Sequence, residues 1–156
     1  MDLPEPSLPK TGRCACGEVR WKALVSPAAG ACHCGMCRRW TGGPFLGVAT
    51  AAFEITQGAE ALGVWKSSDW AERGFCKTCG SSLFYRLTVE GPAQGETHVG
   101  AGGLDDAEGL DWTLEVFTDA QPDFYRFAGE ATRLTEAELM ALIQQTAGAA
   151  PPGADA

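Results

Sequence analysis

Short apolar segments, separated by glycine and polar residues, dominate the chain from Thr11 to about Gly129. Near the start of this stretch, Val19, Trp21 and Ala23 alternate with charged residues, which is the period of two shown by a half-buried strand. The pattern predicts strands over residues 18–25, 45–50, 63–66, 71–76, 82–87, 97–100 and 113–117. We therefore expect a mainly β domain.

A helical period replaces the strand pattern near the end of the chain. Thr135 and Glu138 form a capping-box pattern, and apolar residues then recur at helical spacing. The sequence thus predicts a small single-domain β-sheet fold with a C-terminal helix. We expect an irregular lead-in over 1–10, the β domain over 11–129, a helical segment over 130–146 and a flexible tail over 147–156.

Length and composition are those of one globular domain. The chain has 156 residues, of which 45% are hydrophobic and 21% charged, so a core can form without disulfides. It contains no apolar run of about 18 residues, so no membrane span is predicted. The acidic, proline-containing start does not resemble a secretory signal, and we expect a cytoplasmic protein.

Charge narrows the choice of partners. The formal net charge is −8, and the longest basic run is Arg38-Arg39. Nucleic-acid binding and binding to an anionic membrane surface both need a basic footprint, so neither is expected. The two arginines could bind a substrate carboxylate, or they could be an ordinary solvated pair. A small-molecule partner is favoured.

The seven cysteines fall into three clusters, and this arrangement carries the chemistry. The clusters are Cys14-x-Cys16, Cys32-x-Cys34-x-x-Cys37 and Cys76-x-x-Cys79. In a chain without an export signal, such spacing favours metal ligation over a disulfide framework.

The first and last clusters together match a structural zinc site. Cys14 and Cys16 would project to one side of an extended strand, and Cys76 and Cys79 flank a tight turn that Gly80 permits. Four thiolates form the usual closed, tetrahedral zinc site. The alternative is four unligated cysteines.

The middle cluster has three cysteines and therefore suggests an open zinc site. Cys32 and Cys34 would share a strand face, and Cys37 would return after a turn. Three thiolates leave a fourth position for water or substrate, as at a catalytic zinc. Other interpretations remain open: closure of the site by His98, an iron–sulfur cluster, or a redox-active Cys34–Cys37 dithiol. His33 would point away from its neighbours in an extended segment and is a poor ligand.

Aromatic residues could line a pocket near these thiols, although in a β-rich domain they more often belong to the core. They are Trp40, Phe45, Trp65 and Trp70.

The three motifs, in this order, resemble those of the GFA family, the glutathione-dependent formaldehyde-activating enzymes and their relatives. They read Cys14-Ala15-Cys16-Gly17, Cys32-His33-Cys34-Gly35-Met36-Cys37-Arg38 and Phe75-Cys76-Lys77-Thr78-Cys79-Gly80. The resemblance implies a β-rich fold, a structural zinc on the outer four cysteines and a second, labile zinc on the middle three. It also implies condensation of formaldehyde with glutathione, a carbon–sulfur lyase reaction. Position 15 departs from the pattern, since relatives often have histidine there.

The sequence-based hypothesis is a zinc-dependent carbon–sulfur lyase acting on a glutathione-like thiol and a small carbonyl such as formaldehyde. Two zinc ions per chain are expected, with Cys32, Cys34 and Cys37 as the catalytic set. The alternatives are a non-enzymatic two-zinc binding module and a thiol-redox sensor.

Overall fold

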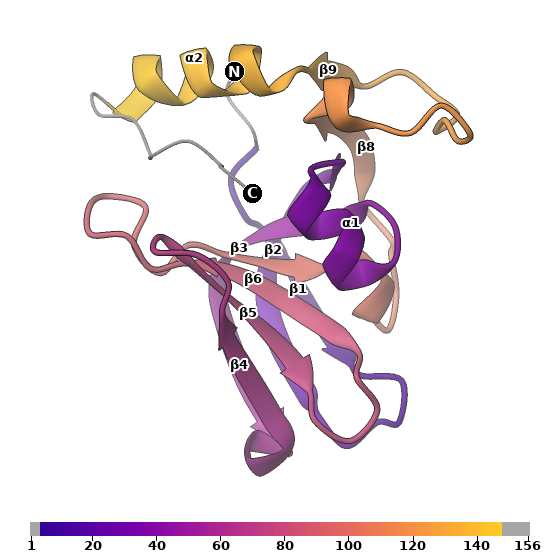
Figure 1. Ribbon diagram of the computed structural model, residues 1–156. Helices are drawn as coiled ribbons and strands as arrows, with labels where there is room; N and C mark the ends of the chain where they lie inside the picture. Colours follow the sequence, from indigo (N-terminus) through magenta and orange to yellow (C-terminus); the bar gives the residue numbers. More distant parts are fainter. Residues whose placement is uncertain (1–3, 148–156) are drawn as a thin grey trace.

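The computed structural model describes residues 4–147, and within them the chain forms one β-sheet and two α-helices (Figure 1). The strands are β1 (Leu8–Arg13), β2 (Arg20–Cys32), β3 (Phe45–Gln57), β4 (Leu62–Lys66), β5 (Ala71–Cys76), β6 (Ser82–Leu87), β7 (Thr97–Gly100), β8 (Asp111–Val116) and β9 (Thr132–Leu134). The helices are α1 (Gly35–Thr41) and α2 (Glu136–Ala147). The predicted fold class, a mainly β domain with a C-terminal helix, is confirmed.

The sheet is ordered β4-β5-β6-β7-β3-β2-β8-β9, with β1 also paired to β2. β2 is the organising strand because its second edge is shared between two partners. Residues 20–25 pair with β1 in antiparallel fashion, and residues 28–32 pair with β8 in parallel fashion. Pro27 lies at the change-over, where it cannot donate a ladder hydrogen bond. The far end of β2 delivers Cys32 between β3 and β8.

The hydrophobic core lies under the face of the sheet that carries Trp21, Val25 and Phe84. All three are almost fully buried, and the Trp21 ring packs 5.9 Å from the ring of Phe53. The alternation expected from the sequence is confirmed here, since Val19, Trp21 and Ala23 are buried while Arg20 and Lys22 are exposed. Burial of these side chains is the main stabilising contribution to such a fold.

Helix α1 lies against the sheet near β3 and β6 (Figure 1). Capping residues at both ends explain where it begins and ends. The Cys34 sulfur accepts a hydrogen bond from the backbone N–H of Cys37, so Cys34 caps the helix. Gly42 adopts a left-handed conformation and ends it. The sequence predicted only a turn after Cys34, because a segment of seven residues is too short to show a helical period.

Helix α2 begins as predicted. The Thr135 backbone N–H donates to the Glu138 carboxylate at 2.8 Å, and the Glu138 backbone N–H donates to the Thr135 hydroxyl at 3.3 Å. This reciprocal pair is the capping box. Within residues 4–147, neither helix is long and apolar enough to cross a membrane.

Two of the expected segments differ from the structure, and a third lies almost wholly outside the described residues. Residues 8–10, which were expected to be irregular, belong to β1, because they find hydrogen-bonding partners on β2. The segment 130–146 contains the short strand β9 before α2 begins. The expected flexible tail lies outside the described residues apart from residue 147, which closes α2.

Candidate metal centre

The outer four cysteines converge at one point, although they are far apart in the sequence. The sulfur atoms of Cys14, Cys16, Cys76 and Cys79 all lie within 4.8 Å of one another. Those of Cys14 and Cys16 are 3.4 Å apart, and Cys16 lies 3.9 Å from Cys76. The grouping predicted from spacing is therefore formed.

Two turns, rather than a strand and a turn, present these four sulfurs. Cys14 follows the last residue of β1, and its carbonyl accepts from the N–H of Gly17, which has φ of 79°. The expected extended geometry for Cys14 and Cys16 is thus corrected to a turn. On the other side Gly80 has φ of 75°, as expected, and its N–H donates to the Cys76 carbonyl at 2.8 Å.

Ser81 links the two turns and sets the electrostatics of Cys79. The backbone N–H of Ala15 donates to the Ser81 hydroxyl at 2.9 Å, and that hydroxyl lies 3.2 Å from the Cys79 sulfur. Hydrogen bonding from the Ser81 side chain, and then from backbone N–H groups, lowers the pKa of the Cys79 thiol to about 5. A thiol of this kind is already a thiolate at neutral pH, which is the form that binds metals.

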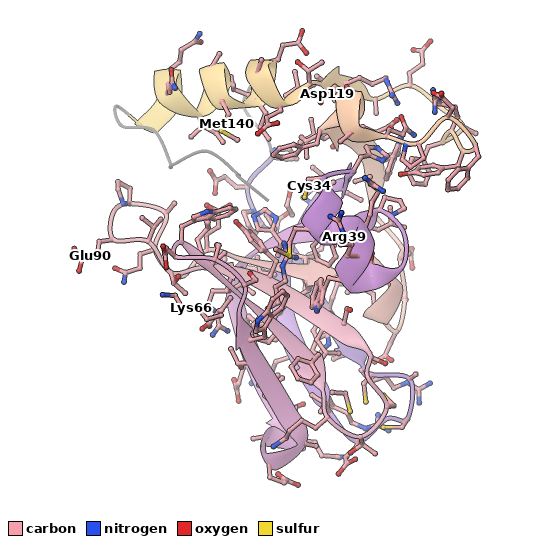
Figure 2. All side chains as sticks on the ribbon, in the orientation of Figure 1. Cys34, Arg39, Lys66, Glu90, Asp119 and Met140 are labelled. Carbon is pink, nitrogen blue, oxygen red and sulfur yellow. The ribbon has the colours of Figure 1, made fainter. Side chains whose placement is uncertain are left out.

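The middle three cysteines form a second group, separate from the outer four. Their sulfurs also lie within 4.8 Å of one another, and this group contains no fourth ligand from the described residues. Cys32 ends β2, Cys34 caps α1 and Cys37 lies in the first turn of that helix. Figure 2 shows Cys34 beside α1. The expected strand for Cys32 and Cys34 is corrected in one respect, because β2 ends at Cys32 and Cys34 lies beyond it as the cap of α1.

The three-thiol group (Cys32, Cys34 and Cys37) favours the thiolate form at Cys34. Hydrogen bonds from the thiols of Cys32 and then Cys37 hold the pKa of the Cys34 thiol well below its usual range, with help from the nearby Arg73 guanidinium. The Nη2 atom of Arg73 donates to the Cys37 sulfur at 3.6 Å. Arg73 comes from β5 and was not singled out by sequence reasoning, since one arginine in a strand has no motif around it.

His33 lies between two of these cysteines but faces away from them, as expected. Its ring is fully buried, with Nε2 2.9 Å from the Glu115 carboxylate and Nδ1 2.8 Å from the Tyr125 hydroxyl. Burial lowers the pKa of His33. The imidazole therefore positions the Cys32–Cys34 segment and is not a ligand.

The other residues singled out from the sequence differ in how close they lie to the three-thiol group. His98 pairs with Glu96 at 2.8 Å and is not part of the three-thiol group, so closure of that group by His98 is not formed. Arg38 donates to the His33 carbonyl at 3.0 Å, while Arg39 is exposed on α1 (Figure 2). Trp40 lies over the Arg73 guanidinium, beside the thiols, whereas Trp65 is exposed on β4.

Both groups fit a metal ion by the chemistry of their donors. All seven cysteines are free thiols, and their sulfurs gather in two separate groups. Four sulfur donors match a closed zinc site, and three match a zinc site with one position left for a ligand. Cys14, Cys16, Cys76 and Cys79 would hold the first ion, and Cys32, Cys34 and Cys37 the second.

Comparison with known proteins places this arrangement in a family. Residues 9–120, which include all seven cysteines, match the sequence profile described as glutathione-dependent formaldehyde-activating enzyme, or GFA. The chain belongs to the GFA family. An uncharacterized lyase of Schizosaccharomyces pombe is 31% identical over 133 residues, which cover 85% of this chain and 95% of that protein.

A solved structure has a similar fold. The crystal structure of a Rhodobacter sphaeroides protein superposes with a TM-score of 0.51 at 23% identity, covering 66% of this chain and 99% of that one. At this level of identity the likeness concerns the fold alone.

Proposed function

We propose that this GFA-family protein is a zinc-dependent carbon–sulfur lyase that joins a glutathione-like thiol to a small carbonyl compound such as formaldehyde. The observation that carries the proposal is the three-thiol group, which gathers three sulfur donors without a fourth protein ligand among the described residues. Membership of the GFA family and similarity to a protein named as a lyase support the same reaction class.

A zinc ion held by three thiolates supplies a position where a substrate thiol binds as its thiolate. The chain itself contributes the shape and charge around that position. Cys32 and Cys34 are partly exposed, so a substrate sulfur can approach them from solvent. Cys37 is buried beneath them and contacts Arg73, which offsets negative charge at the group.

The second half of the reaction needs a carbonyl carbon beside the activated sulfur. Holding both reactants in one place converts a bimolecular encounter into an effectively unimolecular step. Trp40 from α1 and Tyr85 from β6 provide apolar surface on both sides of Arg73, next to Cys37. Such surface excludes water, which would otherwise compete with the thiol for the carbonyl.

The four-thiol group is assigned a structural role. It ties the turn after β1 to the turn after β5, which are 60 residues apart in the sequence between Cys16 and Cys76. A closed site of four thiolates leaves no position for a substrate and stabilises the fold directly.

Native mass spectrometry of the reduced protein, with and without millimolar glutathione, is the first test. We expect two zinc ions per chain and either a glutathione adduct or loss of one zinc on titration. Condensation of glutathione with formaldehyde should then be measurable, and Cys34→Ser should abolish it while circular dichroism stays unchanged. Full activity of Cys34→Ser would refute the proposal. Two zinc ions that ignore glutathione would favour a binding module.

A redox sensor is the other outcome that the geometry allows. Cys34 caps α1 and Cys37 lies in its first turn, with the two sulfurs within 4.8 Å. That function predicts a reversible Cys34–Cys37 disulfide and zinc loss under oxidant, without turnover of any carbonyl. Mass spectrometry after peroxide treatment and reduction separates it from the lyase.

A further inference from the structure

Arg73 lies in a row of polar and aromatic side chains that crosses the sheet beside the three-thiol group. In the strand register Arg73 on β5 is opposite Tyr85 on β6, which is opposite His98 on β7. Residues paired in this way share one face of a sheet. Helix α1 covers the Arg73 end of the row, where the Trp40 ring centre lies 4.9 Å from the Cζ atom of Arg73.

The guanidinium of Arg73 is almost fully enclosed and only partly satisfied. The side chain is 3% exposed, between the rings of Trp40 at 4.9 Å and Tyr85 at 5.2 Å. Nη2 contacts the Cys37 sulfur at 3.6 Å, but Nε and Nη1 are buried without a hydrogen-bond partner in the described part of the chain. A buried donor left unpaired destabilises the fold, and it does so more strongly when it is charged.

A second arginine, on the neighbouring strand, has hydrogen-bond acceptors and serves as a comparison. Arg86 on β6 also lies over an aromatic ring, with Cζ 4.7 Å from the Phe84 ring centre. Its Nη1 donates to Glu72 and its Nε to the Thr97 hydroxyl, both at 3.1 Å. Stacking on a ring thus does not by itself leave the donors of an arginine free, and Arg73 differs because its Nε and Nη1 atoms have no acceptor in the described part of the chain.

The missing acceptor must be small and must arrive from the thiol side. Arg73 is closed off by two rings, while Cys32 and Cys34 next to its partner Cys37 keep some exposure. We propose that one of the two unpartnered donors of Arg73, Nε–H or Nη1–H, binds the oxygen of the small carbonyl substrate at the three-thiol group. This inference rests on the proposed function and adds to it a catalytic residue and a size limit on the substrate.

The step at this oxygen balances without any further reactant. The substrate thiol loses its proton, its sulfur forms a bond to the carbonyl carbon, and the π pair of the C=O bond moves to the oxygen. The oxygen then takes up a proton, so a thiol and an aldehyde become one hydroxyalkyl thioether with nothing oxidised or reduced. Arg73 keeps its own protons at neutral pH and supplies hydrogen bonds where negative charge develops.

The test compares Arg73→Lys and Arg73→Met with the matched control Arg86→Met, using holoprotein with its metal content measured in each case. Lysine keeps the charge but lacks the forked donors, and methionine keeps much of the apolar stem. Formate serves as a one-carbon anionic oxygen probe, titrated calorimetrically into protein preincubated with glutathione. The kinetic constants for formaldehyde are then measured at saturating glutathione.

We expect both Arg73 variants to weaken formate binding by roughly tenfold or more, because hydrogen bonds to a charged group are lost. The kcat for formaldehyde should fall by about 10²-fold or more, as on removal of an oxyanion donor. Glutathione binding and metal content should stay as in the wild type. Arg86→Met should leave formate binding and kcat within about twofold of the wild type.

The remaining outcomes separate this inference from the proposed function. If the wild type turns over no carbonyl but binds formate through Arg73, the acceptor site stands and the lyase assignment fails. If Arg73→Lys retains formate binding and turnover, Arg73 only balances the thiolate charge and the inference is wrong. It is equally wrong if the wild type does not bind formate, or if Arg73→Met binds it as tightly as the wild type.

Discussion

The Nε2 atom of His33 lies 2.9 Å from the Oε2 atom of Glu115, and both side chains are buried. The Arg133 Nη1 atom meets the same carboxylate oxygen at 2.5 Å, and the other ring nitrogen of His33 meets the Tyr125 hydroxyl at 2.8 Å. Glu115 on β8 therefore joins the cysteine motif at the end of β2 to β9, and His33 itself joins that motif to the segment between β8 and β9.

Removing Glu115 should destabilise the fold. Glu115→Ala leaves a nitrogen of the fully buried His33 without its partner, and an orphaned buried polar group costs about 1–3 kcal/mol. Urea denaturation measures the free energy of unfolding. Glu54→Ala is the control, because the Glu54–Lys22 pair is exposed on both sides and should change stability by less than about 0.5 kcal/mol. Equal losses in the two variants would contradict this account.

Near the end of β1, the structure has no room for a side chain at Gly12. A Cβ there would lie 2.2 Å from the Trp21 Cζ2 atom and 2.5 Å from the Gly103 carbonyl oxygen. We expect Gly12→Ala to lower the free energy of unfolding by about 1–3 kcal/mol, since the core must shift to admit it.

Gly43→Ala is the matched control for the Gly12 variant, because a Cβ at Gly43 meets no atom within 4 Å. Its midpoint in thermal denaturation should stay close to that of the wild type. If Gly12→Ala had the same thermal denaturation midpoint as the wild type, the close contact with Trp21 would not lower stability, and the prediction would be wrong.

The two cysteine groups should respond differently to loss of one sulfur. Cys76→Ser breaks the proposed structural site, and we expect loss of one zinc and a fall in Tm of roughly 10 °C or more, because a structural zinc contributes several kcal/mol to folding. Cys34→Ser should lose the other zinc with a much smaller change in Tm. Metal analysis beside calorimetry checks both. If Cys34→Ser lowered Tm more than Cys76→Ser, the three-thiol group would be the structural site, and the roles assigned to the two groups would be wrong.

The α2 cap should weaken in acid. Hydrogen bonds from the backbone and then the hydroxyl of Thr135 hold the pKa of the Glu138 carboxyl below its ordinary value of 4.5. Because the folded-state pKa is the lower one, the stabilisation is present above about pH 4.5 and is lost as the pH falls through the folded-state pKa.

Comparison with Glu138→Gln isolates that effect, because acid effects elsewhere in the protein are common to both chains. The difference in free energy of unfolding between the wild type and Glu138→Gln should shrink as the pH is lowered from 6 to 3. A difference that stays constant over this range would show that ionisation of Glu138 contributes nothing to the cap.

The strands and the cap of α2 could be predicted because their signals are local. Alternation at Val19, Trp21 and Ala23 and the Thr135–Glu138 pair are each contained within a few residues. The two cysteine groups could also be predicted, since ligands at short spacing and the count of four plus three limit how the sulfurs combine. Helix α1 was missed because its start is capped by Cys34, a residue type that rarely signals a cap.

The sequence by itself determined the fold class, the family and the division of the cysteines, because these depend on periodicity and on motifs that stay close in the chain. Only the tertiary structure decided which distant residues surround the three thiols. Arg73 on β5 reaches Cys37 because α1 packs over it through Trp40, and Glu115 reaches His33 because β8 pairs with the second half of β2. Neither contact leaves a local pattern: each depends on strand pairing across many residues, which burial of the whole sheet selects.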